Sequence, residues 1–203
     1  MIIAGYGGLG IEIYGLMIND KLDEPFLFYD ENPNKSIKNK QEVCVTSSLK
    51  KVKCFFTKNS NYFIVGIGHP RLRRKLTKTL EKIGGVPFNY IAPTASILPN
   101  NANYLGLVAQ PGSGISHSTE IGKSCSLHIN SIIGHDVKIG SYVTIGPNSS
   151  IIGPTEVGDY CLIGSNSIIL PNIKIGKNVI VGAGSVVDRN LKDNEIFIGK
   201  RIK

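Results

Sequence analysis

The sequence predicts an α/β domain over residues 1–92, followed by an all-β parallel β-helix over residues 93–203. In the first part, a glycine-rich segment follows the first apolar run, and strand-like and helix-like patterns then alternate. In the second part, an aliphatic residue recurs at every sixth position, which is the signature of a stacked solenoid.

The first domain is expected to contain a parallel sheet, because strand-like runs alternate with helical patterns. The expected strands are residues 1–4, 26–29, 53–57, 62–66 and 88–91. The expected helices are residues 11–19 and 71–83.

A glycine motif lies between the first expected strand and the first helix. Residues 5–10 read Gly-Tyr-Gly-Gly-Leu-Gly and match G-x-G-x-x-G. Backbone N–H groups at a helix N-terminus can hold a diphosphate, and Asp30 or Glu31 at the next strand end can accept hydrogen bonds from a ribose or base. A nicotinamide dinucleotide needs a second mononucleotide half, for which the repeat region leaves no space. The domain is therefore interpreted as half-Rossmann-like; a tight turn without a ligand is the alternative.

The second domain repeats with a period of six. The aliphatic positions are Ile115, Ile121, Leu127, Ile133, Ile139, Ile145, Ile151, Val157, Ile163, Ile169, Ile175, Val181 and Val187. Two residues before each stands a residue that is usually small or β-branched, including Cys125 and Cys161, which are read as core fillers. A glycine often follows the aliphatic residue, and we expect it to supply the backbone conformation of a tight corner. Three hexads then form one triangular coil of 18 residues, because alternate side chains point inward.

Composition narrows the class of protein. The chain has 203 residues and a net charge of +8. We expect a cytoplasmic protein, because no apolar run is long enough for a membrane span and the start lacks the basic region of a signal peptide. The four widely spaced cysteines argue against a zinc or disulfide framework. The positive charge fits either a solvated lysine-rich surface or a preference for polyanionic small molecules, and no motif indicates nucleic-acid binding.

Four segments carry a resemblance to a known family: residues 3–10, 28–31, 66–69 and 130–136. With them, nearly the whole chain resembles the hexapeptide-repeat sugar acyltransferases related to sialic acid O-acetyltransferases. It is most similar to the N-acetyltransferases of nucleotide-linked 4-amino sugars, of the bacillosamine-pathway type. The resemblance implies a left-handed β-helix, a homotrimer with active sites between neighbouring prisms, acetyl-CoA as co-substrate and a nucleotide-activated amino sugar as acceptor. It also implies a role in bacterial surface glycan or lipopolysaccharide biosynthesis.

The resemblance also implies roles for particular residues. The catalytic pair would be His135 and Asp136. Substrate contacts would come from Gly7, Gly8, Leu9, Gly10, Asp30, Glu31, Gly68, His69 and His128. Acetyl-CoA contacts would come from Thr144, Gly153, Gly164, Ser165, Gly182 and Ala183, and the basic residues 199–203 can meet the CoA phosphates or be solvated. Leu9 stands where the family loop often carries a histidine. Thr144 stands where some members carry a second histidine near the thioester carbonyl, and its hydroxyl can still donate a hydrogen bond.

The repeat register supports a catalytic reading of His135. It lies two places after an aliphatic residue, at an exposed corner, where a neutral imidazole can take a proton from an attacking amine or hydroxyl. Asp136 can hold the ring and stabilise the imidazolium. No cysteine or serine has the context of a triad nucleophile, so direct transfer is favoured over an acyl-enzyme. His117 precedes His135 by one coil of 18 residues and should stack on it at about 4.8 Å.

Three alternatives remain open. The first is a sugar O-acetyltransferase of the sialic acid type. The second is a metal-dependent hydratase of the carbonic anhydrase type, in which His117 and His135 bind zinc and His128 completes the site from a neighbouring subunit; we predict no metal, since no supporting carboxylate spacing is present. The third is a noncatalytic scaffold that binds a sugar nucleotide.

Overall fold

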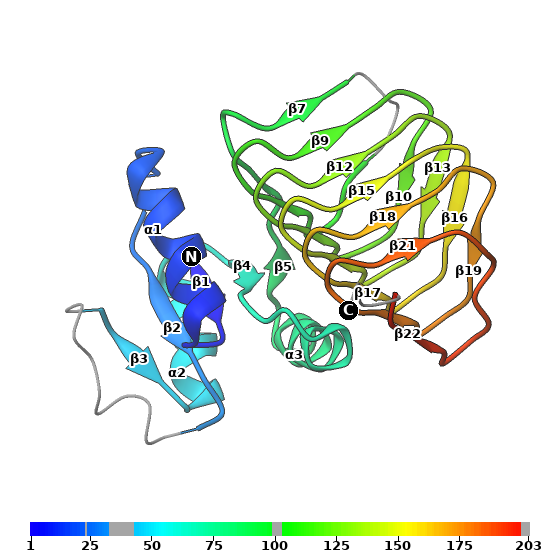
Figure 1. Cartoon of the computed structure of the whole chain (residues 1–203). Helices are drawn as coiled ribbons and strands as arrows, with labels where there is room; N and C mark the ends of the chain where they lie inside the picture. The colour runs from blue at the N-terminus through cyan, green and yellow to red at the C-terminus, as the bar shows by residue number, and fades with distance from the viewer. Residues whose placement is uncertain (23, 33–42, 99–102, 200–203) are drawn as a thin grey trace. The chain divides into compact units, whose positions relative to one another are not determined.

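The computed structural model describes residues 1–22, 24–32, 43–98 and 103–199 (Figure 1). The expected basic tail, residues 200–203, lies outside this range. The chain divides into two compact units, one made of residues 1–68 and 72–89 and the other of residues 69–71 and 90–203. The second unit begins at residue 90 because the strand there pairs with a strand of the solenoid.

The N-terminal unit contains a five-stranded parallel sheet with the order β3-β2-β1-β4-β5. Its strands are β1 Ile2–Ala4, β2 Leu27–Tyr29, β3 Val45–Thr46, β4 Tyr62–Val65 and β5 Val86–Pro87. Its helices are α1 Gly8–Asn19, α2 Leu49–Lys58 and α3 Pro70–Lys82. The central strand β1 is fully buried and entirely apolar, as expected for a parallel strand covered on both faces. This is the half-Rossmann-like arrangement that the sequence predicts.

Two expected strands are wrong. Residues 53–57 belong to helix α2. Of the expected strand 88–91, only Tyr90–Ile91 is a strand, and it pairs with Val108–Ala109 of the β-helix instead of the N-terminal sheet.

Helix α2 begins after Ser48, whose hydroxyl accepts a hydrogen bond from the Lys51 N–H at 3.4 Å. Val52 and Phe56 lie one turn apart and are both buried, so the apolar residues follow a helical period. A further difference is that α1 begins at Gly8, inside the glycine motif and three residues earlier than expected.

The C-terminal unit is a left-handed parallel β-helix, in which the strands of successive coils pair to form three parallel sheets (Figure 1). One sheet contains β10 Glu120–Ile121, β13 Val137–Ile139, β16 Thr155–Val157 and β19 Lys174–Ile175. A second contains β6 Tyr90–Ile91, β8 Val108–Ala109, β11 Ser126–Leu127, β14 Thr144–Ile145, β17 Leu162–Ile163, β20 Ile180–Val181 and β22 Ile196–Phe197. The third contains β7 Ser96–Ile97, β9 Gly114–Ile115, β12 Ile132–Ile133, β15 Ser150–Ile151, β18 Ile168–Ile169 and β21 Val186–Val187. Leu127 pairs with Ile145 and Ile145 with Ile163, which confirms the 18-residue coil.

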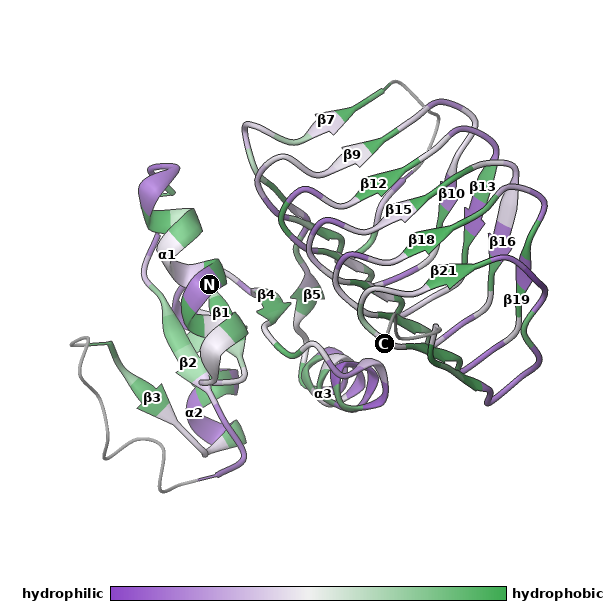
Figure 2. Cartoon of the chain, in the orientation of Figure 1, coloured by the Kyte–Doolittle hydropathy of each residue, from purple (hydrophilic) through white to green (hydrophobic). Residues whose placement is uncertain are grey.

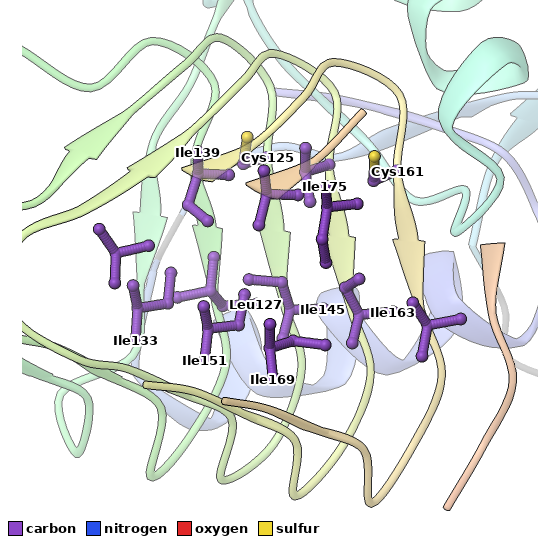
Figure 3. Close-up of a cluster of buried hydrophobic side chains, with 14 of the residues drawn as sticks. Cys125, Leu127, Ile133, Ile139, Ile145, Ile151, Cys161, Ile163, Ile169 and Ile175 are labelled. Carbon is purple, nitrogen blue, oxygen red and sulfur yellow. The ribbon is translucent and has the colours of Figure 1, made fainter. Parts of the chain in front are cut away.

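The repeated aliphatic residues fill the interior of the β-helix. Rows such as Ile133, Ile151 and Ile169 follow one another along its axis (Figure 3). The residues two positions earlier are buried too, and several of their polar groups donate to carbonyls in the next coil. The Ser149 hydroxyl donates to the Gly164 carbonyl at 2.7 Å, and the Cys161 thiol donates to the Gly176 carbonyl at 3.0 Å. These bonds remove the penalty for burying a hydroxyl or thiol in the core.

We expected the repeat glycines to supply the backbone conformation of a tight corner, and this expectation is wrong. The left-handed backbone conformation lies two residues later, at non-glycine positions such as Ser124 (φ 52°), Asn130 (φ 57°) and Asp136 (φ 54°). A Cβ built on Gly146 would lie 2.7 Å from the Ser165 nitrogen of the next coil. The glycines are therefore required because successive coils approach closely, rather than for a special φ.

The outer faces of the β-helix differ in polarity. Figure 2 shows hydrophilic residues on β13, β16 and β19 and hydrophobic residues on β12, β18 and β21. On the first face, Lys138 lies 3.6 Å from Glu120 and Lys174 lies 3.4 Å from Glu156. In the described part of the chain, no helix has the length and hydrophobicity of a membrane span.

Candidate active site

His135 and Asp136 form a hydrogen-bonded pair on the corner between β12 and β13. The His135 Nδ1 lies 2.8 Å from Asp136 Oδ2, and about half of each side chain is exposed. An ionised carboxylate only accepts hydrogen bonds, so Nδ1 is the donor; in the neutral imidazole this tautomer leaves the lone pair on Nε2. Asp136 has a φ of 54°, and the short polar side chain of aspartate tolerates this left-handed conformation. The repeat geometry therefore holds the carboxylate beside the ring.

His117 lies one coil before His135, as predicted. The two rings are stacked, with centroids 5.5 Å apart and planes inclined by 11°. The Asp136 N–H donates to the His117 carbonyl at 3.3 Å, so the two corners are also joined through the backbone. The Nδ1 of His117 lies 3.2 Å from the Ser118 hydroxyl. One face of the His135 ring is thus covered by a second aromatic ring.

Gly153 occupies the same corner one coil after His135. A Cβ at this position would overlap the His135 carbonyl oxygen, so no other residue fits without moving the His135 backbone. The peptide bond from Gly153 to Pro154 is cis. Gly153 was predicted to contact acetyl-CoA, and its position shows a packing requirement against His135.

Asp136 lines a pocket of about 320 Å³, whereas His135 is not among its lining residues. The corner contributes Asp136, Pro154 and Asn172, and the adjacent sheet contributes Lys138, Glu156 and Lys174. Among the described residues, no group of three or more His, Cys, Asp or Glu side chains is placed to hold a metal ion.

The other β-helix residues that were predicted to contact substrate or acetyl-CoA lie away from the His135 corner. His128 follows β11, Gly164 and Ser165 follow β17, and Gly182 and Ala183 follow β20, so all five share the corner at the other edge of the β12 sheet. The reason is the coil length, because equivalent corner positions are separated by multiples of 18, as His128, Gly164 and Gly182 are, and Ser165 and Ala183 are the next residues in their coils. Thr144 lies on β14 and is 5% exposed.

In the N-terminal unit, the glycines of the motif have two different roles. A Cβ on Gly10 would overlap the Gly5 carbonyl oxygen, so Gly10 allows α1 to pack against the end of β1. A Cβ on Gly7 or Gly8 would meet nothing within 4 Å, so their backbone faces open space at the N-terminus of α1. Leu9, between Gly8 and Gly10, is half-buried. The open glycines suit a ligand that approaches the backbone.

The segment between β4 and α3 contains Gly68 and the exposed His69. Arg73, which no sequence motif indicates, is 3% exposed and donates to the carbonyls of Ile67 and Gly68 at 2.9 and 3.1 Å. These bonds tie the segment to α3. No local pattern distinguishes Arg73 from the other basic residues of this helix.

A second pocket, of about 90 Å³, lies where β1, β2 and β4 end. Asp30 and Glu31 line it together with Gly5, Ile67, Leu72, Lys75 and Leu76. Both Asp30 oxygens accept backbone hydrogen bonds, from Tyr6 at 2.8 Å and from Asn32 at 2.9 Å. Glu31 forms an ion pair with Lys75 at 2.8 Å, and the hydrogen bond from Lys75 to Glu31 raises the pKa of Lys75. Lys75 was not predicted, because it is 44 residues from Glu31.

Comparison with known proteins assigns both units. The family model "PglD N-terminal domain" matches residues 1–80, and the model "Bacterial transferase hexapeptide (six repeats)" matches residues 111–153 and 154–189. A search of curated proteins gives no match.

Several solved structures are similar over nearly the whole chain. PerB from Caulobacter crescentus, solved in complex with CoA and GDP-perosamine, has a TM-score of 0.88 and 27% identity, covering 98% of this chain and 93% of PerB. WeeI from Acinetobacter baumannii AYE has a TM-score of 0.87 and 25% identity, covering 98% and 95%. The acetyltransferase domain of PglB from Neisseria gonorrhoeae, with acetyl coenzyme A, shares the fold with a TM-score of 0.84 and 21% identity, covering 100% and 97%. Each unit therefore matches a family model of its own: the first unit that of the PglD N-terminal domain, and the second that of the bacterial hexapeptide-repeat transferases.

Proposed function

We propose that this protein transfers the acetyl group of acetyl-CoA to the amino group of a nucleotide-linked amino sugar, within bacterial surface glycan biosynthesis. The observation that carries the proposal is the half-exposed His135–Asp136 pair, of which Asp136 lines a pocket of about 320 Å³. It lies in a chain similar along its length to PerB, which was crystallised with CoA and GDP-perosamine. Perosamine is an amino sugar, and the Caulobacter protein is described as a perosamine N-acetyltransferase.

The pair is suited to general-base catalysis. As the sugar amine attacks the thioester carbonyl, Nε2 of His135 takes a proton from the nitrogen, and Asp136 stabilises the imidazolium through Nδ1. The tetrahedral intermediate then collapses, the C–S bond breaks, and the CoA thiolate leaves and receives the proton from His135. The products are the acetamido sugar nucleotide and free CoA.

A covalent acetyl-cysteine intermediate is disfavoured by the state of the cysteines. Cys125 and Cys161 are the two cysteines of the β-helix, and both are buried. Burial raises the pKa of the Cys161 thiol to about 11, so this sulfur is protonated and shielded near neutral pH. Direct attack on the thioester fits the site better.

Substrate binding is assigned to both units. The open backbone of Gly7 and Gly8 suits the diphosphate, with Asp30 near the nucleoside. On the β-helix, the predicted acetyl-CoA residues such as Ser165 and Ala183 share a corner different from that of His135. We therefore propose a homotrimer in which the His135 corner of one subunit faces the Ser165–Ala183 corner of a neighbour.

The activity is tested by incubating the protein with acetyl-CoA and UDP-, dTDP- and GDP-linked amino sugars while following free thiol. His135→Ala should lower kcat by about 10²- to 10⁴-fold. Glu120→Ala is the matched control, because this residue is 74% exposed and loses only a surface ion pair with Lys138. Wild-type turnover by His135→Ala would refute the proposed base. Release of thiol with hydroxyl acceptors alone would indicate O-acetylation, and nucleotide binding without release would indicate a scaffold.

The shared site is tested by mixing two inactive variants. His135→Ala removes the base from one corner, and Ala183→Trp blocks the exposed residue of the other corner. If sites form between subunits, mixed trimers assembled by refolding together contain some intact sites and regain activity. If mixtures that light scattering shows to be trimeric regain no activity, the His135 corner and the Ser165–Ala183 corner would have to act within one subunit.

A further inference from the structure

We propose that the pocket of the N-terminal unit selects nucleotides whose base presents a lactam edge, namely guanine, uracil or thymine, and that Lys75 and Glu31 read this edge. A lactam edge is a carbonyl oxygen beside a ring N–H. The inference rests on the proposed function, since it names the class of base that the nucleotide site accepts.

The pocket has the shape and polarity that a base requires. Ile67, Leu72 and Leu76 supply an apolar wall, suited to the flat face of a heterocycle. The polar residues Asp30, Glu31 and Lys75 complete the lining of this volume of about 90 Å³. All of these residues belong to the N-terminal unit.

Asp30 and Glu31 are placed for different tasks. Asp30 receives a backbone N–H on each oxygen, from Tyr6 and from Asn32, so its carboxylate is held at the end of β2. That is the position from which the acidic residue of a mononucleotide-binding half contacts the ribose. The next residue, Glu31, is then the carboxylate available to the base.

Lys75 and Glu31 present a donor beside an acceptor. Their Nζ and Oε2 atoms are 2.8 Å apart. An ammonium has three donor hydrogens and a carboxylate has two oxygens, so each group can bind a ligand while the pair stays intact. The bond to Glu31 also raises the pKa of Lys75, which keeps the donor protonated.

This arrangement matches one kind of base edge. In guanine, O6 lies beside N1–H, and in uracil and thymine O4 lies beside N3–H; Lys75 can donate to the oxygen while Glu31 accepts from the N–H. Adenine and cytosine carry an amino group beside an unprotonated ring nitrogen. They would place the amino group against the ammonium and the ring nitrogen against the carboxylate. A ribose held near Asp30 prevents the base from turning its edge around.

The test is calorimetric binding of GDP, UDP, dTDP, ADP and CDP to the full chain. We expect the first three to bind at least about tenfold more tightly than ADP and CDP, as for a good bidentate contact to a base edge. Glu31→Gln and Lys75→Met should reduce this ratio to about twofold or less. Lys78→Met is the matched control, since Lys78 is exposed on the same helix and does not line the pocket.

The outcomes separate this inference from the proposed function. Equal binding of all five diphosphates would overturn the inference that Lys75 and Glu31 select the base. So would an affinity ratio that is unchanged in both Glu31→Gln and Lys75→Met. Either result would leave the acetyltransferase proposal standing. If no diphosphate bound at all, the nucleotide site itself would be refuted, and this inference with it. If the protein showed the tenfold preference for GDP, UDP and dTDP but transferred no acetyl group, only the proposed reaction would be refuted.

Discussion

The imidazole rings of His117 and His135 stack one coil apart, with centroids separated by 5.5 Å and planes inclined by 11°. The His117 ring limits rotation of the His135 ring, which must stay aligned for Nε2 to accept a proton. An aromatic pair contributes about 0.5–1.5 kcal/mol, so His117→Ala should lower kcat by up to about tenfold and leave KM for acetyl-CoA unchanged.

His117→Phe is the control for this first prediction. It keeps a flat ring and removes the nitrogens, so most of the wild-type kcat should remain. If the phenylalanine variant is as slow as the alanine variant, His117 contributes a polar interaction rather than stacking.

A methyl group at Gly153 should disturb the catalytic corner, because a Cβ there overlaps the His135 carbonyl oxygen. Gly153→Ala is expected to lower Tm by several degrees and to reduce kcat. Gly182→Ala is the matched control for Tm alone, since its Cβ would first meet Ile198 at an ordinary 3.4 Å, whereas its predicted contact with acetyl-CoA makes it unsuitable as a control for kcat. Equal melting temperatures for the two variants would show that the coil at Gly153 can adjust.

The charge and the backbone role of Asp136 can be separated. Asp136→Asn keeps a side chain that tolerates a φ of 54° but removes the negative charge, so kcat should fall by about 10²-fold with little change in Tm. Asp136→Ala should lose activity and also melt at a lower temperature, because alanine is strained in this conformation. Full activity of the asparagine variant would remove the carboxylate from the mechanism.

Thiol labelling should distinguish the two pairs of cysteines. Cys44 and Cys54 are exposed, whereas Cys125 and Cys161 are buried. Since burial raises the pKa of Cys161 to about 11, its thiolate fraction at pH 8 is on the order of one in a thousand. Intact mass after brief maleimide treatment at pH 8 should show two additions on the folded protein and four in guanidinium. Rapid native labelling of Cys161 would contradict the described core.

Periodic features of the sequence predicted the β-helix in detail. A period of six placed the thirteen aliphatic residues, all buried except the half-buried Ile121. The coil of 18 residues also predicts that His117 lies next to His135, which the stacked rings confirm. In the N-terminal unit, the glycine motif and the alternating pattern predicted the parallel sheet, but the short apolar run in residues 53–57 was misread as a strand when it is one face of α2.

Features that repeat along the chain can be predicted from its residues alone, because a periodic pattern shows which residues share a face or a corner. Only the tertiary structure brought Lys75 to Glu31, since that contact joins two elements with no common period. It alone showed that Gly153 is required by its contact with the His135 carbonyl, and that the repeat glycines allow close stacking of coils instead of unusual backbone angles. Such contacts depend on distances between backbones, which the residue pattern does not contain.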